Sequence, residues 1–243
     1  MGNPITWFDL ISTNSEQTSK FYSEVFGWHV DHFPDMSYHI FDTHAGSGIP
    51  GGTSDTREGQ APVAIPYIEN PDIDTLLAKA VEAGATVVMP VTEVPEMVTF
   101  AHIRDPFGNV IGLVKGDGTV RTSEGTNPPV DWVELSVVEP SKAYDWYRDV
   151  FGWTINEDPM PEGQQHAQVD TGGGIHGGIG GTPTGQPMVT VYARVNDLGE
   201  YLKRAANLGA KTVMEPMQVD ETTHIAAFAD PQGNMFGLYS TGS

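Results

Sequence analysis

The sequence predicts an α+β protein with two similar domains, each built from two β-α-β-β-β modules. The first observation is a repeat in which FYSEVFGWHV, at residues 21–30, returns as WYRDVFGWTI at residues 146–155. The second is that DPFGNVIGLV, at 105–114, returns as DPQGNMFGLY at 230–239 with the same offset of 125 residues. The third is the order of apolar patterns, in which short strand-like stretches surround stretches with helical spacing. The chain is therefore a tandem duplication, and its 243 residues suffice for two ordinary cores.

The first quarter of the chain contains one complete module. Residues 5–12 are rich in β-branched and aromatic residues and predict a strand. Residues 16–26 place apolar side chains at helical spacing, and Gly27 predicts the helix end, because glycine adopts the left-handed C-cap conformation without steric cost. Three short strands are expected next, over residues 28–33, 37–43 and 48–54.

The second module repeats this order. A strand over residues 61–69 precedes a helix that ends at Gly84. Three strands are expected over residues 86–91, 98–104 and 110–115, with the sequence DPFGN as the turn before the last. Two more modules follow after a stretch rich in Gly, Pro, Ser and Thr. We therefore predict a first domain over residues 1–117, a linker over 118–129 and a second domain over 130–243.

The composition limits the classes of partner. Acidic residues outnumber basic ones 32 to 12, which gives a net charge of −20. Such a surface repels phosphate backbones and anionic lipids, so neither nucleic acid nor membrane is an expected partner. The absence of Cys excludes disulfides and thiolate metal sites. With no secretory signal and no apolar run of membrane-spanning length, the expected location is the cytoplasm.

The paired modules, the aromatic-Tyr pair before a helix-ending Gly and the DPxGN turn together resemble the vicinal oxygen chelate superfamily. This superfamily includes glyoxalase I, bleomycin-resistance proteins and extradiol dioxygenases. Among its subgroups, the chain looks most like two-domain, hydroxylase-labelled actinobacterial proteins, whose domains open with a motif that here reads WFDL from Trp7 and WVEL from Trp132. The resemblance implies that each domain folds its modules into a curved mixed sheet around a cleft.

The resemblance also implies where metal ligands would lie in a metal-dependent member. In the first half the matching positions are Trp7, Ile65 and Gly112, and in the second half they are Trp132, Thr190 and Gly237. Trp, Ile and Gly side chains cannot coordinate a cation, and a neutral Thr hydroxyl is a poor ligand. We therefore expect no metal and no cofactor in either cleft.

Two carboxylates are candidates for catalysis. Strand alternation places Asp9 on the same face as Trp7, and Glu134 on the same face as Trp132. Each could act as a general base or accept a hydrogen bond from a substrate hydroxyl. Each could equally organise the domain by accepting hydrogen bonds from backbone amides or from a Tyr. His102, on the strand before a DPxGN turn, is a further candidate for acid–base chemistry.

Six residues are candidates for ligand binding. Recognition sites are mostly apolar with a few polar groups, and the aromatic positions could line a pocket for a flat ligand. The candidates are Trp7, Tyr67, Trp132, Tyr192, His224 and His176. The alternative role of the aromatic residues is core packing, whereas Trp28 and Trp153 are expected to pack within the domains.

The predicted function is binding of a small, aromatic or metabolite-type ligand in a metal-free cleft. The first alternative is a cofactor-free or substrate-assisted enzyme, of the hydroxylase or isomerase type, that uses Asp9, Glu134 or a cleft His. The second alternative is a divalent-metal lyase or dioxygenase with non-standard ligands. The expected partner is a small molecule, and the chain is expected to be a monomer with paired domains or a homodimer.

Overall fold

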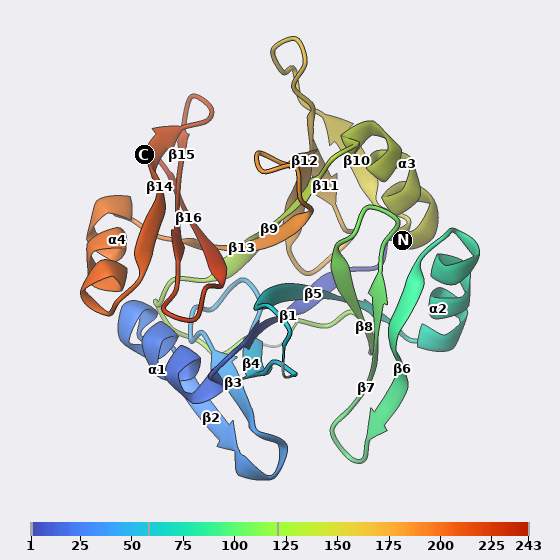
Figure 1. Cartoon of the computed structure of the whole chain (residues 1–243), viewed down its shortest axis with the longest axis horizontal. Helices are drawn as coiled ribbons and strands as arrows, with labels where there is room; N and C mark the ends of the chain where they lie inside the picture. The colour runs from blue at the N-terminus through green and yellow to red at the C-terminus, as the bar shows by residue number, and fades with distance from the viewer. Residues whose placement is uncertain (1, 58, 121, 243) are drawn as a thin grey trace. The chain divides into compact units, whose positions relative to one another are not determined.

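The computed structural model describes residues 2–57, 59–120 and 122–242. Each half of the chain forms one mixed sheet of eight strands, and the helices are few (Figure 1). The strand order in the first half is β2-β3-β4-β1-β5-β8-β7-β6, and the second half repeats it as β10-β11-β12-β9-β13-β16-β15-β14. The predicted α+β fold with tandem repeats is therefore confirmed.

The modules follow the predicted order. In the first half they comprise β1 (Ile5–Ser12), α1 (Ser15–Phe26), β2 (His29–Phe33), η1 (Pro34–Met36), β3 (Tyr38–Asp42), β4 (Gly51–Asp55), β5 (Val63–Asn70), α2 (Ile73–Glu82), β6 (Thr86–Val94), β7 (Val98–Arg104) and β8 (Val110–Lys115). In the second half they comprise β9 (Val130–Val137), α3 (Pro140–Phe151), β10 (Thr154–Glu157), β11 (His166–Asp170), β12 (His176–Gly181), β13 (Met188–Arg194), α4 (Leu198–Asn207), β14 (Lys211–Gln218), β15 (Thr223–Ala229) and β16 (Met235–Thr241).

Local signals explain the helix ends. The side chain of Asn14 accepts a hydrogen bond from the backbone N–H of Gln17 at 2.9 Å, which caps the start of α1. Gly27 ends α1 with a φ of 77°, and Gly152 ends α3 with a φ of 70°. Because few other residues adopt this left-handed conformation, the repeated glycine fixes the same exit from both helices.

Parallel pairing fixes which residues face each other near the middle of each sheet. Asp9 on β1 lies opposite Gly52 on β4, and Glu134 on β9 lies opposite Gly178 on β12. Glycine-rich backbone therefore runs beside both candidate carboxylates. The turn before β12 requires glycine for a separate reason, since Gly172, Gly173 and Gly174 have φ values of 83°, 153° and 63°.

The compact units of the chain combine modules from different halves. The first compact unit comprises Met1–Trp7, Ile65–Val120 and Trp132–Val189. The second comprises Phe8–Ala64, Arg121–Asp131 and Thr190–Ser243. Within the first unit α2 packs against α3, and within the second α1 packs against α4 (Figure 1). The predicted domain limits at 1–117 and 130–243 stay predictions.

Aromatic side chains form the core of the second compact unit. Tyr22 and Phe26 of α1 meet Phe236 of β16, with ring centroids 5.0 and 5.4 Å away. Trp28 stacks on Phe26 at 4.6 Å and donates its indole N–H to the carbonyl of Pro128 at 2.9 Å. A segment predicted as linker therefore contacts the core through its backbone.

The first compact unit repeats this arrangement with the roles of the halves exchanged. Tyr147 of α3 stacks on Trp153 at 5.1 Å, and the Trp153 indole donates to the carbonyl of Asn3 at 2.7 Å. The Tyr147 hydroxyl donates to Oδ2 of Asp105, in the DPxGN turn, at 2.6 Å. Trp28 and Trp153 are both fully buried, which confirms their predicted packing role. Among the described helices, none has the length and apolar character needed to span a membrane.

Candidate functional site

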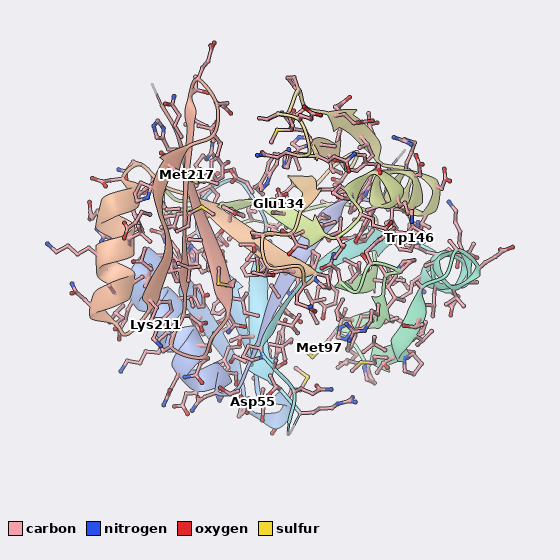
Figure 2. All side chains as sticks on the ribbon, turned by 45° about the horizontal axis from the view of Figure 1, so that its top comes forward. Asp55, Met97, Glu134, Trp146, Lys211 and Met217 are labelled. Atoms are coloured by element: carbon pink, nitrogen blue, oxygen red, sulfur yellow. The ribbon has the colours of Figure 1, made fainter. Side chains whose placement is uncertain are left out.

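Two of the predicted site residues lie on β9. Trp132 and Glu134 are half-buried, whereas Val133 and Leu135, which alternate with them, are fully buried. This alternation places the Trp and the carboxylate on one face of the sheet, as the sequence predicts. Figure 2 labels Glu134, on β9, and Trp146, on α3. The Trp146 indole N–H donates a hydrogen bond to the backbone carbonyl of Ala83 at 2.9 Å.

Glu134 belongs to a cluster of three ionisable side chains. Nδ1 of His166, on β11, lies 2.6 Å from Oδ2 of Asp158, and its Nε2 lies 3.3 Å from Oε1 of Glu134. Glu134 and Asp158 together raise the pKa of His166 to about 9, against the opposing effect of burial. His166 is therefore an imidazolium at neutral pH, held between two carboxylates. The Trp132 indole N–H also points at Glu134, 3.4 Å from Oε2.

Glycines of β12 make room for this cluster. A Cβ atom at Gly178 would overlap Oε2 of Glu134 and would lie 2.6 Å from Nε2 of His166. A Cβ atom at Gly180 would lie 3.0 Å from Oε1 of Glu134. The missing side chains of Gly178 and Gly180 thus leave the space in which the Glu134 carboxylate and the His166 imidazole contact each other.

Asp9, the counterpart of Glu134, has a different partner. The Tyr38 hydroxyl donates to Oδ1 of Asp9 at 2.5 Å, and Asp9 is only 5% exposed. A Cβ atom at Gly52 would overlap the Tyr38 hydroxyl, so the phenol lies directly over the strand at this point. Of the two roles that the sequence left open for Asp9, this contact is the structural one, in which the carboxylate accepts a hydrogen bond from a Tyr.

Tyr67 and His102 form a buried pair. The Tyr67 hydroxyl lies 2.8 Å from Nε2 of His102, and both residues are less than one-tenth exposed. His102 also contacts the ring of Phe100, with centroids 5.4 Å apart. The Tyr67 hydroxyl and the His102 ring nitrogen thereby satisfy each other's hydrogen bonding inside the protein.

The remaining predicted histidines lie on different strands. His176 is exposed at the start of β12, opposite Trp132, with Nδ1 3.7 Å from Oδ1 of Asp170. His224 is half-buried on β15, opposite Ser240. The structure therefore brings His176 beside Trp132 in register, while His224 contributes to the other compact unit.

Tyr rings cover the points where the superfamily would place its carboxylate ligand. Tyr67 lies opposite Gly112, and a Cβ atom there would overlap Cδ1 of the Tyr67 ring. Tyr192 covers Gly237 in the same way. A side chain cannot emerge from either glycine while these rings are in place.

The donor sets at the superfamily's ligand positions do not fit a divalent cation. Ile65 and Thr190 are buried, and neither offers an anionic or imidazole donor. In the part of the chain that the structure describes, no group of three or more His, Asp or Glu side chains is arranged to hold a metal ion. His166 makes its contacts with carboxylates through both ring nitrogens, which is the arrangement of an imidazolium rather than of a metal ligand.

Sequence reasoning missed Asp158 and His166. The strand registers identify His166 as the counterpart of Tyr38, since His166 lies opposite Gly180 and Tyr38 lies opposite Ser54. The loops before these two strands differ in length, so the offset of 125 residues does not connect them. Asp158 and His166 could therefore be identified as site residues only from the pairing of the strands, which the sequence does not reveal.

Comparison with known proteins gives relatives of similar length. A Mycobacterium tuberculosis (strain CDC 1551 / Oshkosh) protein named "Putative glyoxylase CFP32" is 28% identical over 98% of this chain and 94% of its own length. The anthracycline biosynthesis protein DauV of Streptomyces sp. (strain C5) is 23% identical over 96% of this chain and 91% of its own. The anthracycline biosynthesis protein DnrV of Streptomyces peucetius is 24% identical over the same shares.

Solved structures share the fold at low identity. The 2,3-dioxygenase LapB from Pseudomonas sp. KL28 superposes with a TM-score of 0.71 at 15% identity, over 100% of this chain and 94% of that one. The Mn(II)-bound glyoxalase from Novosphingobium aromaticivorans gives a TM-score of 0.71 at 14% identity, over 98% and 82%. The family model for the Glyoxalase/Bleomycin resistance protein/Dioxygenase superfamily matches residues 5–113 and 130–238. With both halves matched along most of their length, this chain belongs to the Glyoxalase/Bleomycin resistance protein/Dioxygenase superfamily.

Proposed function

We propose that the chain binds a small, flat aromatic molecule without the help of a metal ion. The observation that carries this proposal is the pair of Trp132 and Glu134 on one half-buried strand face, at a position where metal-dependent members would hold a ligand. An indole offers stacking surface, and the adjacent carboxylate offers a hydrogen-bond acceptor that fixes orientation.

The relatives indicate the kind of aromatic molecule to test first. Two of them are named for anthracycline biosynthesis. Anthracyclines contain an anthraquinone ring system with phenolic hydroxyl groups, which matches an aromatic surface beside a carboxylate. The net charge of −20 further favours a neutral or cationic ligand over an anionic one.

Tryptophan fluorescence provides the test. Emodin, a hydroxylated anthraquinone, is titrated into the purified protein before and after treatment with EDTA. We expect saturable quenching that is unchanged by EDTA and is largely lost in Trp132→Phe. Absence of quenching by emodin and by a panel of other aromatic phenols would refute the proposal. Binding that disappears with EDTA and returns with a divalent cation would refute its metal-free part.

A second candidate function is acid–base catalysis by the same cluster. It is favoured by one observation, the raised pKa of His166, because an imidazolium beside a carboxylate can donate a proton while Glu134 accepts one. The test is mass spectrometry of hydroxylated anthraquinones incubated with the protein and with Glu134→Gln. A product formed only by the wild-type chain supports catalysis, and equal product from both excludes Glu134 as the base.

A further inference from the structure

The two halves present different groups at one equivalent point of their sheets. Asp9 and Glu134 occupy the same register position beside glycine-rich strands. The partner of each carboxylate comes from the strand beyond the adjacent glycine-rich strand, β3 in the first half and β11 in the second. It is a phenol in the first half and an imidazole in the second. The duplication has therefore diverged in the side chain that contacts this carboxylate.

The first-half carboxylate is closed. Asp9 is 5% exposed and receives the Tyr38 hydroxyl at 2.5 Å, a short and therefore strong hydrogen bond. The phenol also lies over Gly52, where even a methyl group would overlap it. A ligand could reach Asp9 only by displacing this hydroxyl and breaking its bond.

The second-half carboxylate is accessible. The side chains of Glu134 and His166 are 18% and 27% exposed, and that of Asp158 is 25% exposed. Nδ1 of His166 makes the tight contact of the cluster, 2.6 Å from Asp158, whereas the contacts of Glu134 with His166 and with Trp132 are 3.3 to 3.4 Å long. Long contacts leave acceptor capacity on Glu134 for a better donor.

We propose that the ligand binds to the second half alone, where Glu134 accepts a hydrogen bond from a neutral phenolic or enolic hydroxyl, and where Asp158 and His166 position that carboxylate. This inference rests on the proposed function and specifies its site and its ligand class. Glu134 is the group that touches the ligand, and His166 and Asp158 are positioning residues.

The charges around the cluster select the neutral form of the hydroxyl. Burial and the negative charges of Glu157, Glu134 and Asp158 raise the pKa of Tyr144 to about 12, which shows that three carboxylates lie near this point. The imidazolium of His166, between Glu134 and Asp158, supplies one positive charge against them. The cluster therefore keeps a negative balance while His166 is charged. A phenolate or a carboxylate placed beside Glu134 would be repelled, whereas a neutral O–H donor gains a charge-assisted hydrogen bond.

Calorimetric titration with emodin tests the inference in the intact chain. We expect one molecule bound per chain, and about tenfold or greater weakening in Glu134→Gln and in His166→Tyr, which copies the Tyr of the first half. The matched control is Tyr38→Phe, which we expect to bind as the wild type does. Rhein, which adds a carboxylate to the same ring system, should bind more weakly than emodin.

A pH series distinguishes positioning by His166 from a general structural effect. The advantage of the wild type over His166→Gln should shrink as the pH rises through about 9, because the imidazolium is lost there. A defect that is equal at every pH would contradict the positioning role, and thermal melts identify any variant that fails to fold.

The outcomes separate this inference from the proposed function. Two molecules bound per chain, or affinity lost in Tyr38→Phe and kept in Glu134→Gln, would overturn the inference while the proposed function stands. Failure of every chain to bind any aromatic phenol would overturn both.

Discussion

His166 links the candidate site to the stability of the fold. Its pKa is raised above that of an unfolded His, so between about 6.5 and 9 the folded state binds a proton that the unfolded state has released. The stabilisation is complete below the lower value and is lost as the pH rises through the upper one. We expect the free energy of unfolding of the wild type to exceed that of His166→Gln by about 1–2 kcal/mol near pH 6, after allowance for solvent screening.

Urea denaturation of both chains at a series of pH values measures this difference. The gap in the free energy of unfolding should narrow towards pH 10, where neither chain carries the imidazolium. A gap that widens with pH would show that His166 is neutral in the folded protein.

Gly237 is a second residue with a measurable role. A Cβ atom there would overlap the ring of Tyr192, so Gly237→Ala should force the ring aside and cost about 1–3 kcal/mol, the range typical of overpacking. The double variant with Tyr192→Ala should show a smaller additional cost from the alanine, because the obstructing ring is gone. Thermal unfolding of the four chains measures the coupling, and strictly additive losses would contradict it.

At the scale of single residues, the sequence predicted which face of a strand a side chain occupies better than which other side chain it contacts. It placed Glu134 and Trp132 on one strand face because side-chain alternation is a local property. It could not predict that His166 would reach Glu134, since that contact depends on the pairing of β11 with β12 and of β12 with β9. It predicted Tyr67 only as a pocket-lining candidate, and the His102 partner again depends on strand pairing.

At the scale of elements, the two repeated motifs act as partners of one another. Tyr147 of α3 donates to Asp105 in the DPxGN turn of the other half. In the second compact unit, Tyr22 of α1 faces Asp230 but makes no hydrogen bond of ordinary geometry, and Asp230 instead accepts from the Asn234 side chain at 2.9 Å. The motif that reveals the duplication therefore also joins the halves.

These two tyrosines form a matched pair of variants. Tyr147→Phe removes a buried hydrogen bond and leaves Oδ2 of Asp105 without its phenol donor, so we expect a loss of about 1–3 kcal/mol. Tyr22→Phe removes a buried hydroxyl that has no such bond, so its cost should be smaller. Chemical denaturation measures both losses. A larger loss in Tyr22→Phe would mean that its contact with Asp230 is the stronger one.

Helices and strands themselves were predictable from local signals. Asn14, Gly27 and the apolar spacing between them specify α1, and each signal acts within a few residues. The partner of α1 was not predictable, because its apolar face would fit any helix or sheet of suitable shape. That face meets α4, from the opposite half of the chain.

At the scale of the whole molecule, the duplication produces compact units that each need both halves. In the second unit Phe26 packs on Tyr201 at 5.6 Å and on Phe236 at 5.4 Å, and neither partner belongs to the first half. In the first unit the Lys79 ammonium donates to the carbonyl of Val150 at 2.9 Å, again across the halves. The repeats in the sequence show that two copies exist. They do not show that each compact unit combines a module of one copy with a module of the other.

A divided chain tests this interdependence. A fragment of residues 1–117 would expose Phe26 and the apolar face of α1, so we expect it to be unfolded or self-associated by circular dichroism and size-exclusion chromatography. Mixing it with a fragment of residues 118–243 should restore a cooperative thermal transition and a one-to-one complex, because each fragment supplies what the other lacks. A monomeric fragment that unfolds cooperatively by itself would show that the contacts within each half suffice, and that the pairing across halves adds stability without being required for folding.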